Sequence, residues 1–151
     1  MIRARAYAPG DARLIEARDA QRVEARVLYG ALAHARPPGP AYTILDGDTA
    51  IACGGLIPVW PGYAQAWGFA GALPPRAALA IVRQFARALA VLAALQAVNR
   101  IEATARCDFP LAQRFLEKLQ FARVAKLDRY GPDGGDYWLY ALLPEQAGGV
   151  T

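Results

Sequence analysis

The feature that most constrains the fold is a run of three strand-like segments followed by one long apolar helix. Between residues 41 and 70, apolar segments alternate with the turn sequences Asp46-Gly47-Asp48 and Trp60-Pro61-Gly62, as in a β-meander. Prolines 74 and 75 then precede a segment with helical spacing of apolar residues, and Leu79 is expected to be its first buried residue. The apolar residues of this segment are Leu79, Val82, Phe85, Leu89 and Leu92. A meander that continues into such a helix predicts an α+β domain built on one sheet.

The segments on either side extend this pattern. Strands are predicted at residues 2–8, 41–45, 49–58, 63–70, 100–105, 121–130 and 136–143. Helices are predicted at residues 12–17, at 19–32, from Pro74 or Pro75 to Asn99, and after a cap at Asp108. The order is β-α-α-β-β-β-α-β-α-β-β, which gives a mixed sheet flanked by helices. The strands at Tyr63 and Arg100 should be parallel neighbours, because the long helix connects them.

The length and composition fit one globular domain. The chain has 151 residues, enough for one complete core, and 55% of them are hydrophobic, which excludes a disordered chain. We expect the domain to span residues 1–144 and residues 145–151 to form a flexible tail.

The distribution of charged residues and the apolar segments limit the binding partners and the cellular location that we expect for the protein. The net charge is +4, but the arginines are scattered, so a nucleic-acid partner is not expected. The longest apolar run, residues 77–98, contains Arg83, Gln84 and Arg87, which argues against a membrane span. Residues 1–9 lack the apolar core of a secretory signal.

The two cysteines predict neither a metal site nor a redox motif. Cys53 and Cys107 are far apart in the sequence and have no histidine nearby. A reduced, cytoplasmic protein is therefore expected.

Two segments resemble motifs of the GNAT acyltransferase family. Residues 46–55, DGDTAIACGG, resemble the family's dG-x-x-I-G-x-x-x hairpin. Residues 112–121, AQRFLEKLQF, resemble its A-x-x-L-Y-x-K-x-G-F signature, and the element order is similar over nearly the whole chain. The resemblance implies a single GNAT-like domain that uses acetyl-CoA or CoA. The implied acceptor is an amine on a small molecule or a protein, and a homodimer is compatible with it.

Two further stretches resemble GNAT-like proteins encoded by phages and prophages. They are residues 100–109, RIEATARCDF, and residues 130–140, YGPDGGDYWLY. This second resemblance implies an alternative, a catalytically inactive protein with a structural or interaction role in a virion or its assembly. Its partners would then be phage structural proteins and its location a phage particle.

The family resemblance also implies where the acyl donor binds. Acyl-CoA would lie between the parallel strands at residues 63–70 and 100–105, and its pantetheine would pair with the first of them. Its pyrophosphate would lie where the long helix begins. The residues implied are Trp67, Gly68, Phe69, Ala70, Gly71, Ala72, Leu73, Arg76 and Ala77.

This sequence departs from the family pattern at two places. In the phosphate loop, residues 71–76 read GALPPR, and the two prolines remove two N–H donors. The guanidinium of Arg76 would partly compensate for them. In the helix signature, Leu116 occupies the tyrosine position and cannot donate a proton to a leaving thiolate. These departures predict a degenerate site, so the sequence leaves open whether the protein is an enzyme.

For a catalytic base, Glu102 is the leading candidate. It lies on a short strand that should be mostly covered, where a carboxylate needs a partner such as Arg100, Arg106 or Thr104. The alternative for Glu102 is a structural ion pair. Glu24 is a second candidate, and His34 is a weak one.

Three hypotheses therefore stand: an acyl-CoA-dependent N-acyltransferase, an inactive GNAT-like protein and a basic nucleic-acid-binding module. An open gap between the two parallel strands would favour the first, and a gap filled by bulky side chains would favour the second.

Overall fold

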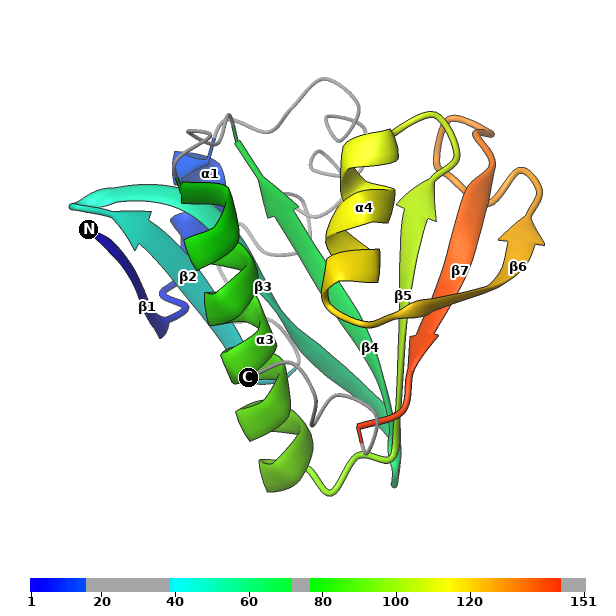
Figure 1. Ribbon diagram of the computed structural model, residues 1–151, viewed down its shortest axis with the longest axis horizontal. Helices are drawn as coiled ribbons and strands as arrows, with labels where there is room; N and C mark the ends of the chain where they lie inside the picture. The colour runs from blue at the N-terminus through cyan, green and yellow to red at the C-terminus, as the bar shows by residue number, and fades with distance from the viewer. Residues whose placement is uncertain (16–38, 72–76, 145–151) are drawn as a thin grey trace.

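A computed structural model describes residues 1–15, 39–71 and 77–144. These residues form one seven-stranded mixed sheet with helices on both faces (Figure 1). The strands are β1 (Ile2–Ala6), β2 (Ala41–Asp46), β3 (Thr49–Trp60), β4 (Tyr63–Ala70), β5 (Arg100–Arg106), β6 (Ala122–Leu127) and β7 (Tyr137–Leu142). The helices are α1 (Asp11–Leu14), α3 (Ala78–Leu95) and α4 (Pro110–Lys118). The predicted α+β class is confirmed.

The strand order in the sheet is β1-β2-β3-β4-β5-β7-β6. Only β4 and β5 are parallel, as predicted from the helix that joins them. All other neighbours are antiparallel. The sheet thus has two antiparallel parts, β1 to β4 and β5 to β6, which meet at the parallel pair.

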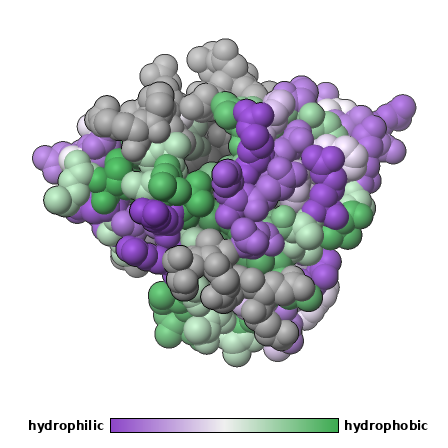
Figure 2. Space-filling view, viewed as in Figure 1, coloured by the Kyte–Doolittle hydropathy of each residue, from purple (hydrophilic) through white to green (hydrophobic). Residues whose placement is uncertain are grey.

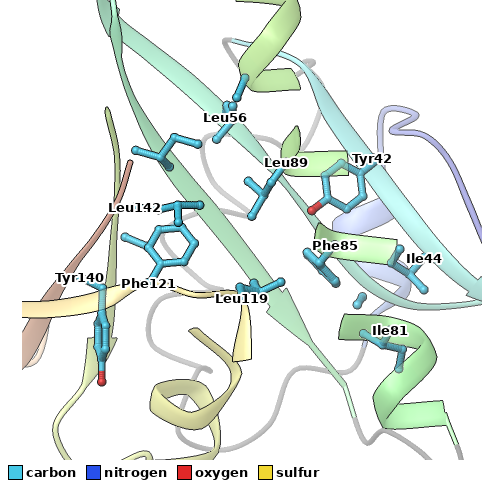
Figure 3. Close-up of a cluster of buried hydrophobic side chains, with 14 of the residues drawn as sticks. Tyr42, Ile44, Leu56, Ile81, Phe85, Leu89, Leu119, Phe121, Tyr140 and Leu142 are labelled. Atoms are coloured by element: carbon cyan, nitrogen blue, oxygen red, sulfur yellow. The ribbon is translucent and has the colours of Figure 1, made fainter. Parts of the chain in front are cut away.

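Helices α3 and α4 cover one face of the sheet, and α1 lies on the other (Figure 1). The larger core lies under α3 and α4, where Phe85 and Leu89 of α3 approach Leu119 and Phe121 (Figure 3). A smaller cluster on the α1 face includes Tyr7, Ile15 and Cys53.

Helix α3 is long and apolar enough to cross a membrane by length and composition alone. A core helix of a globular domain has the same properties, and the buried side of α3 packs on the sheet through Ile81, Phe85, Leu89 and Ala93. The prediction that Leu79 is the first buried residue is wrong, because the buried stripe follows Ile81 and leaves Leu79 60% exposed.

Several predicted boundaries also differ. Strand β1 ends at Ala6, β3 extends to Trp60, and β6 and β7 are shorter than predicted. Helix α3 ends at Leu95 instead of Asn99. The expected N-cap at Asp108 is wrong, because Phe109 precedes α4 and the Asp108 carboxylate binds Arg106 instead. The predicted helix 19–32, with Glu24, and His34 lie outside the described residues.

Candidate functional site

The two parallel strands separate after a short paired segment. Pairing between β4 and β5 covers three residue pairs and ends at Gln65 and Glu102. Beyond this point β4 continues to Ala70 along β3, and β5 continues to Arg106 along β7. Each strand keeps a full antiparallel partner on its outer side, so the inner edges diverge as the sheet twists (Figure 1).

A cavity of about 690 Å³ lies over this gap, between the diverging strands and helices α3 and α4. Its volume is within the range of small-molecule binding sites. The sheet contributes small residues to it, namely Gly55, Ala66, Gly68, Ala70, Ala103 and Ala105. Because these side chains are so short, α3 and α4 can pack on the sheet and still leave a space above the gap.

The walls of the cavity are mostly apolar. Leu79, Val82 and Phe85 line it from α3, and Phe115 and Leu116 line it from α4. Phe85 and Phe115 pack edge to face, with ring centres 5.0 Å apart, across the space between the helices. This apolar site can hold the uncharged part of an extended ligand.

The cavity also reaches the other face of the sheet. Side chains alternate along a strand, so Trp67, Thr104 and Arg106 project away from the buried alanines beside them. All three still line the cavity. A ligand in the gap is therefore in reach of groups on both faces.

Glu102 lies where the gap begins, on the face opposite α3 and α4, next to the cavity but not among the residues that line it. Its side chain is 21% exposed. Its carboxylate accepts a hydrogen bond from the hydroxyl of Tyr63 at 2.5 Å and one from Nε of Arg100 at 2.9 Å. Of the three partners that the sequence suggested, Arg100 is the one found here. Gln65 donates to the Tyr63 hydroxyl at 3.3 Å and extends the cluster.

These contacts shift the pKa values of both groups. The hydrogen bond from Tyr63 is the main reason that the pKa of Glu102 lies below its ordinary value; burial opposes this effect and Arg100 adds to it. Burial and the Glu102 carboxylate raise the pKa of Tyr63. Glu102 is thus ionised at neutral pH, while Tyr63 keeps its proton.

The predicted donor-binding residues fall into two groups. Trp67, Gly68 and Ala70 line the cavity, and Phe69 lies between them on β4. Gly71 follows the strand, and its N–H donates to the carbonyl of Ile51. Ala77 is buried at the N-cap of α3. Ala72, Leu73 and Arg76 lie outside the described residues, as does most of the predicted phosphate loop.

Leu116 on α4 lies within the described residues. Leu116, which the sequence resemblance aligns with a tyrosine of the family signature, lines the cavity from α4 with an apolar side chain. Tyr137 and Tyr140 are buried in β7 and do not line the cavity. The tyrosine that lines the cavity among the described residues is Tyr42, on β2.

Arg106 is the last residue of β5. Its guanidinium binds Asp108 at 2.9 Å and Asp133 at 3.0 Å, which fastens the loop between β6 and β7 to the end of the strand. These two carboxylates raise the pKa of Arg106 against the opposing effect of burial, and the side chain stays charged.

Sequence reasoning missed three residues of this region. Tyr63 contacts Glu102 from the neighbouring strand, a contact that depends on the register of β4 and β5. Arg114 and Lys118 line the cavity from α4. Their spacing of four residues in a predicted helix was a signal that they share one face.

No family model and no curated protein matches the sequence, but solved structures do. A chimera of spermidine N-acetyltransferase SpeG from Vibrio cholerae and hSSAT has a TM-score of 0.70 at 17% identity, with 97% of each chain covered. A GNAT-family acetyltransferase from Streptococcus pneumoniae has a TM-score of 0.70 at 12% identity, with 95% of this chain and 99% of that one covered.

A third solved structure is Ard1 from Thermoplasma volcanium. Its TM-score is 0.68 at 16% identity, with 94% of this chain and 97% of that one covered. At these identities the likeness shows the fold and not the reaction. This chain therefore has the fold of the GNAT acetyltransferases.

Proposed function

We propose that the protein is an acyl-CoA-dependent N-acyltransferase. The observation that carries the proposal is the cavity over the gap between β4 and β5, which small side chains keep open. A thioester with a long uncharged arm fits this apolar space. Pairing between β4 and β5 ends at Gln65, and we expect the amides of that arm to pair with β4 beyond this point.

The reaction is an acyl transfer from sulfur to nitrogen. The nitrogen of an amine forms a bond to the thioester carbon, the carbon–sulfur bond breaks, and the amine loses a proton while the thiolate gains one. Each oxygen of Glu102 accepts one hydrogen bond and keeps a further acceptor site, so the carboxylate can bind an ammonium group. Glu102 remains our candidate for the group that takes the proton.

Proton transfer to the leaving thiolate has no partner on α4, because Leu116 is apolar. The hydroxyls among the described lining residues are those of Tyr42 and Thr104 on the sheet. If neither hydroxyl reaches the thiolate, water has to supply that proton, and turnover is slow as a result. Leu116 also favours a second candidate function, an inactive protein of the phage type that keeps the cavity but not the reaction.

The test is acylation of an amine panel with acetyl-CoA, measured as acylated product by mass spectrometry. Spermidine belongs in the panel because one similar structure is a spermidine N-acetyltransferase. We expect product with wild type and a loss of kcat/KM of about tenfold or more in Glu102→Gln. Glu117→Gln, a change at a half-exposed carboxylate on α4, is the control and should leave kcat/KM unchanged.

One outcome would count against the enzyme, and another would count against Glu102 as its base. Donor binding with no product from any amine would favour the inactive candidate. Product formation that is equal in wild type and Glu102→Gln would leave Glu102 a structural ion pair.

A further inference from the structure

The charges around the cavity have one sign. Among the described residues that line it, the charged ones are Arg106, Arg114 and Lys118, and all are cations. No described carboxylate lines the cavity. An apolar site bordered by positive charge suits a ligand with an uncharged arm and an anionic end.

Arg106 is not available for a ligand, because Asp108 and Asp133 already bind its guanidinium. Arg114 and Lys118 differ from it. Both are exposed, and no described carboxylate lies within ion-pair distance of either. The nearby Glu117 is 4.0 Å from Arg123 instead.

The two cations lie one helical turn apart on α4. Residues four apart are neighbours on a helix, and two like charges there repel each other. Their repulsion opposes the folded helix, and an anion between the two side chains would relieve it. Figure 2 shows hydrophilic side chains over α4, beside a hydrophobic strip between α4 and α3.

The start of α3 is a poorer place for an anion than the fold would suggest. Prolines 74 and 75 have no N–H groups to donate. The N–H of Gly71 already binds the carbonyl of Ile51. The first N–H groups of α3 itself, which no side chain caps, are the backbone donors left at this end. A phosphate therefore has fewer backbone donors there, and it needs cationic side chains from elsewhere.

We propose that Arg114 and Lys118 bind the phosphate groups of the acyl donor, at the α4 edge of the cavity. The inference rests on the proposed function and adds the residues that recognise the nucleotide end of CoA. Arg114 supplies a planar fork of N–H donors, and Lys118 supplies a compact charge. The uncharged arm of the donor then lies in the apolar cavity beside them.

The test compares binding of CoA and of pantetheine, which lacks every phosphate, by isothermal titration at physiological ionic strength. The variant is Arg114→Gln with Lys118→Gln. Two partly solvated contacts should lower CoA affinity about tenfold and leave pantetheine affinity unchanged.

The matched control is Arg83→Gln with Arg87→Gln. These two exposed arginines are also four residues apart, on α3, but they do not line the cavity. The control removes the same net charge, and its effect on CoA affinity should be less than about twofold because salt screens distant charges. Circular dichroism would confirm that both double variants fold.

The outcomes separate the two proposals. CoA affinity that is unchanged in the α4 variant, or lowered equally in both double variants, overturns this inference and leaves the proposed function standing. Failure of wild type to bind CoA overturns the proposed function, and this inference with it.

Discussion

At the scale of single residues, the carboxylate of Asp11 fixes the start of the chain to the sheet. It is buried, and it accepts hydrogen bonds from Arg5 at 2.6 and 3.0 Å, from the N–H of Ala8 at 2.8 Å and from the hydroxyl of Thr43 at 2.7 Å. A buried charge is tolerated only where such partners replace water. These bonds therefore tie β1 and α1 to β2.

Asp11→Asn should lower the free energy of unfolding by about 2 kcal/mol, because the amide cannot replace all of these charge-assisted hydrogen bonds. Urea titration measures the change. Asp48→Asn is the control: Asp48 is fully exposed and lies 3.6 Å from Arg3, so its loss should leave the free energy of unfolding nearly unchanged. Equal losses in the two variants would contradict this account.

Stability should also depend on pH through Asp11. Burial raises the pKa of this carboxyl, but the hydrogen bonds from Arg5, Ala8 and Thr43 outweigh burial, so the pKa is below its ordinary value. The folded protein thus binds this proton less tightly than the unfolded chain does. The stabilisation is present above the ordinary aspartate pKa of about 3.9, and it is lost as the pH falls through the lower folded-state pKa.

Unfolding free energies at about pH 7 and at about pH 3, which is below the ordinary aspartate pKa of about 3.9, would check this prediction. Wild type should lose more stability between them than Asp11→Asn does. The variant should still lose some, because Glu102, Asp108, Asp133 and Asp136 also have lowered pKa values. Identical losses would show that Asp11 is not coupled to folding.

Some of the candidate site could be predicted from single residues. A carboxylate on a covered strand needs a partner, and this requirement led to Glu102 and to Arg100 as one of three choices. Tyr63 could not be found this way, because 39 positions separate it from Glu102 and only the strand register brings them together.

At the scale of elements, the proposed function makes α4 the helix that limits how fast the site turns over. Its apolar residues Leu111, Phe115 and Leu116 face the cavity, and none of them can donate a proton. Leu116→Tyr should therefore raise kcat by about tenfold or more, with little change in KM, because general acid catalysis of this kind contributes at least that much. Steady-state kinetics with the best amine would measure it.

The matched control for this change is Leu116→Phe, which adds the same ring without the hydroxyl. It should leave kcat near the wild-type value or below it. A similar rise in both variants would assign the effect to packing and would contradict a missing proton donor.

The order of the elements could be predicted, since the meander and the long helix have strong periodic patterns. The residues at which the helices and strands begin and end could not be predicted in the same way. Helix α3 stops four residues before Asn99, because Ala97 adopts a left-handed backbone conformation that no glycine marks in the sequence. Asp108 had the residue type of a cap, but its ion pair with Arg106 competes for the carboxylate.

At the scale of the whole molecule, two antiparallel parts of a sheet meet at three parallel residue pairs and diverge into a wedge. The cavity results from this arrangement of the strands, and no single sequence motif encodes it. The sequence could predict the parallel neighbours, but whether the wedge is open depends on side chains from β4, β5, α3 and α4 together.

The most direct test of this account is isothermal titration of CoA into wild type, Ala112→Phe and Ala90→Phe. Ala112 lines the cavity on α4, and Ala90 is exposed on α3 away from it. The account predicts micromolar binding to wild type and to Ala90→Phe, and none to Ala112→Phe. No heat from wild type at millimolar CoA, or equal binding by all three proteins, would contradict it.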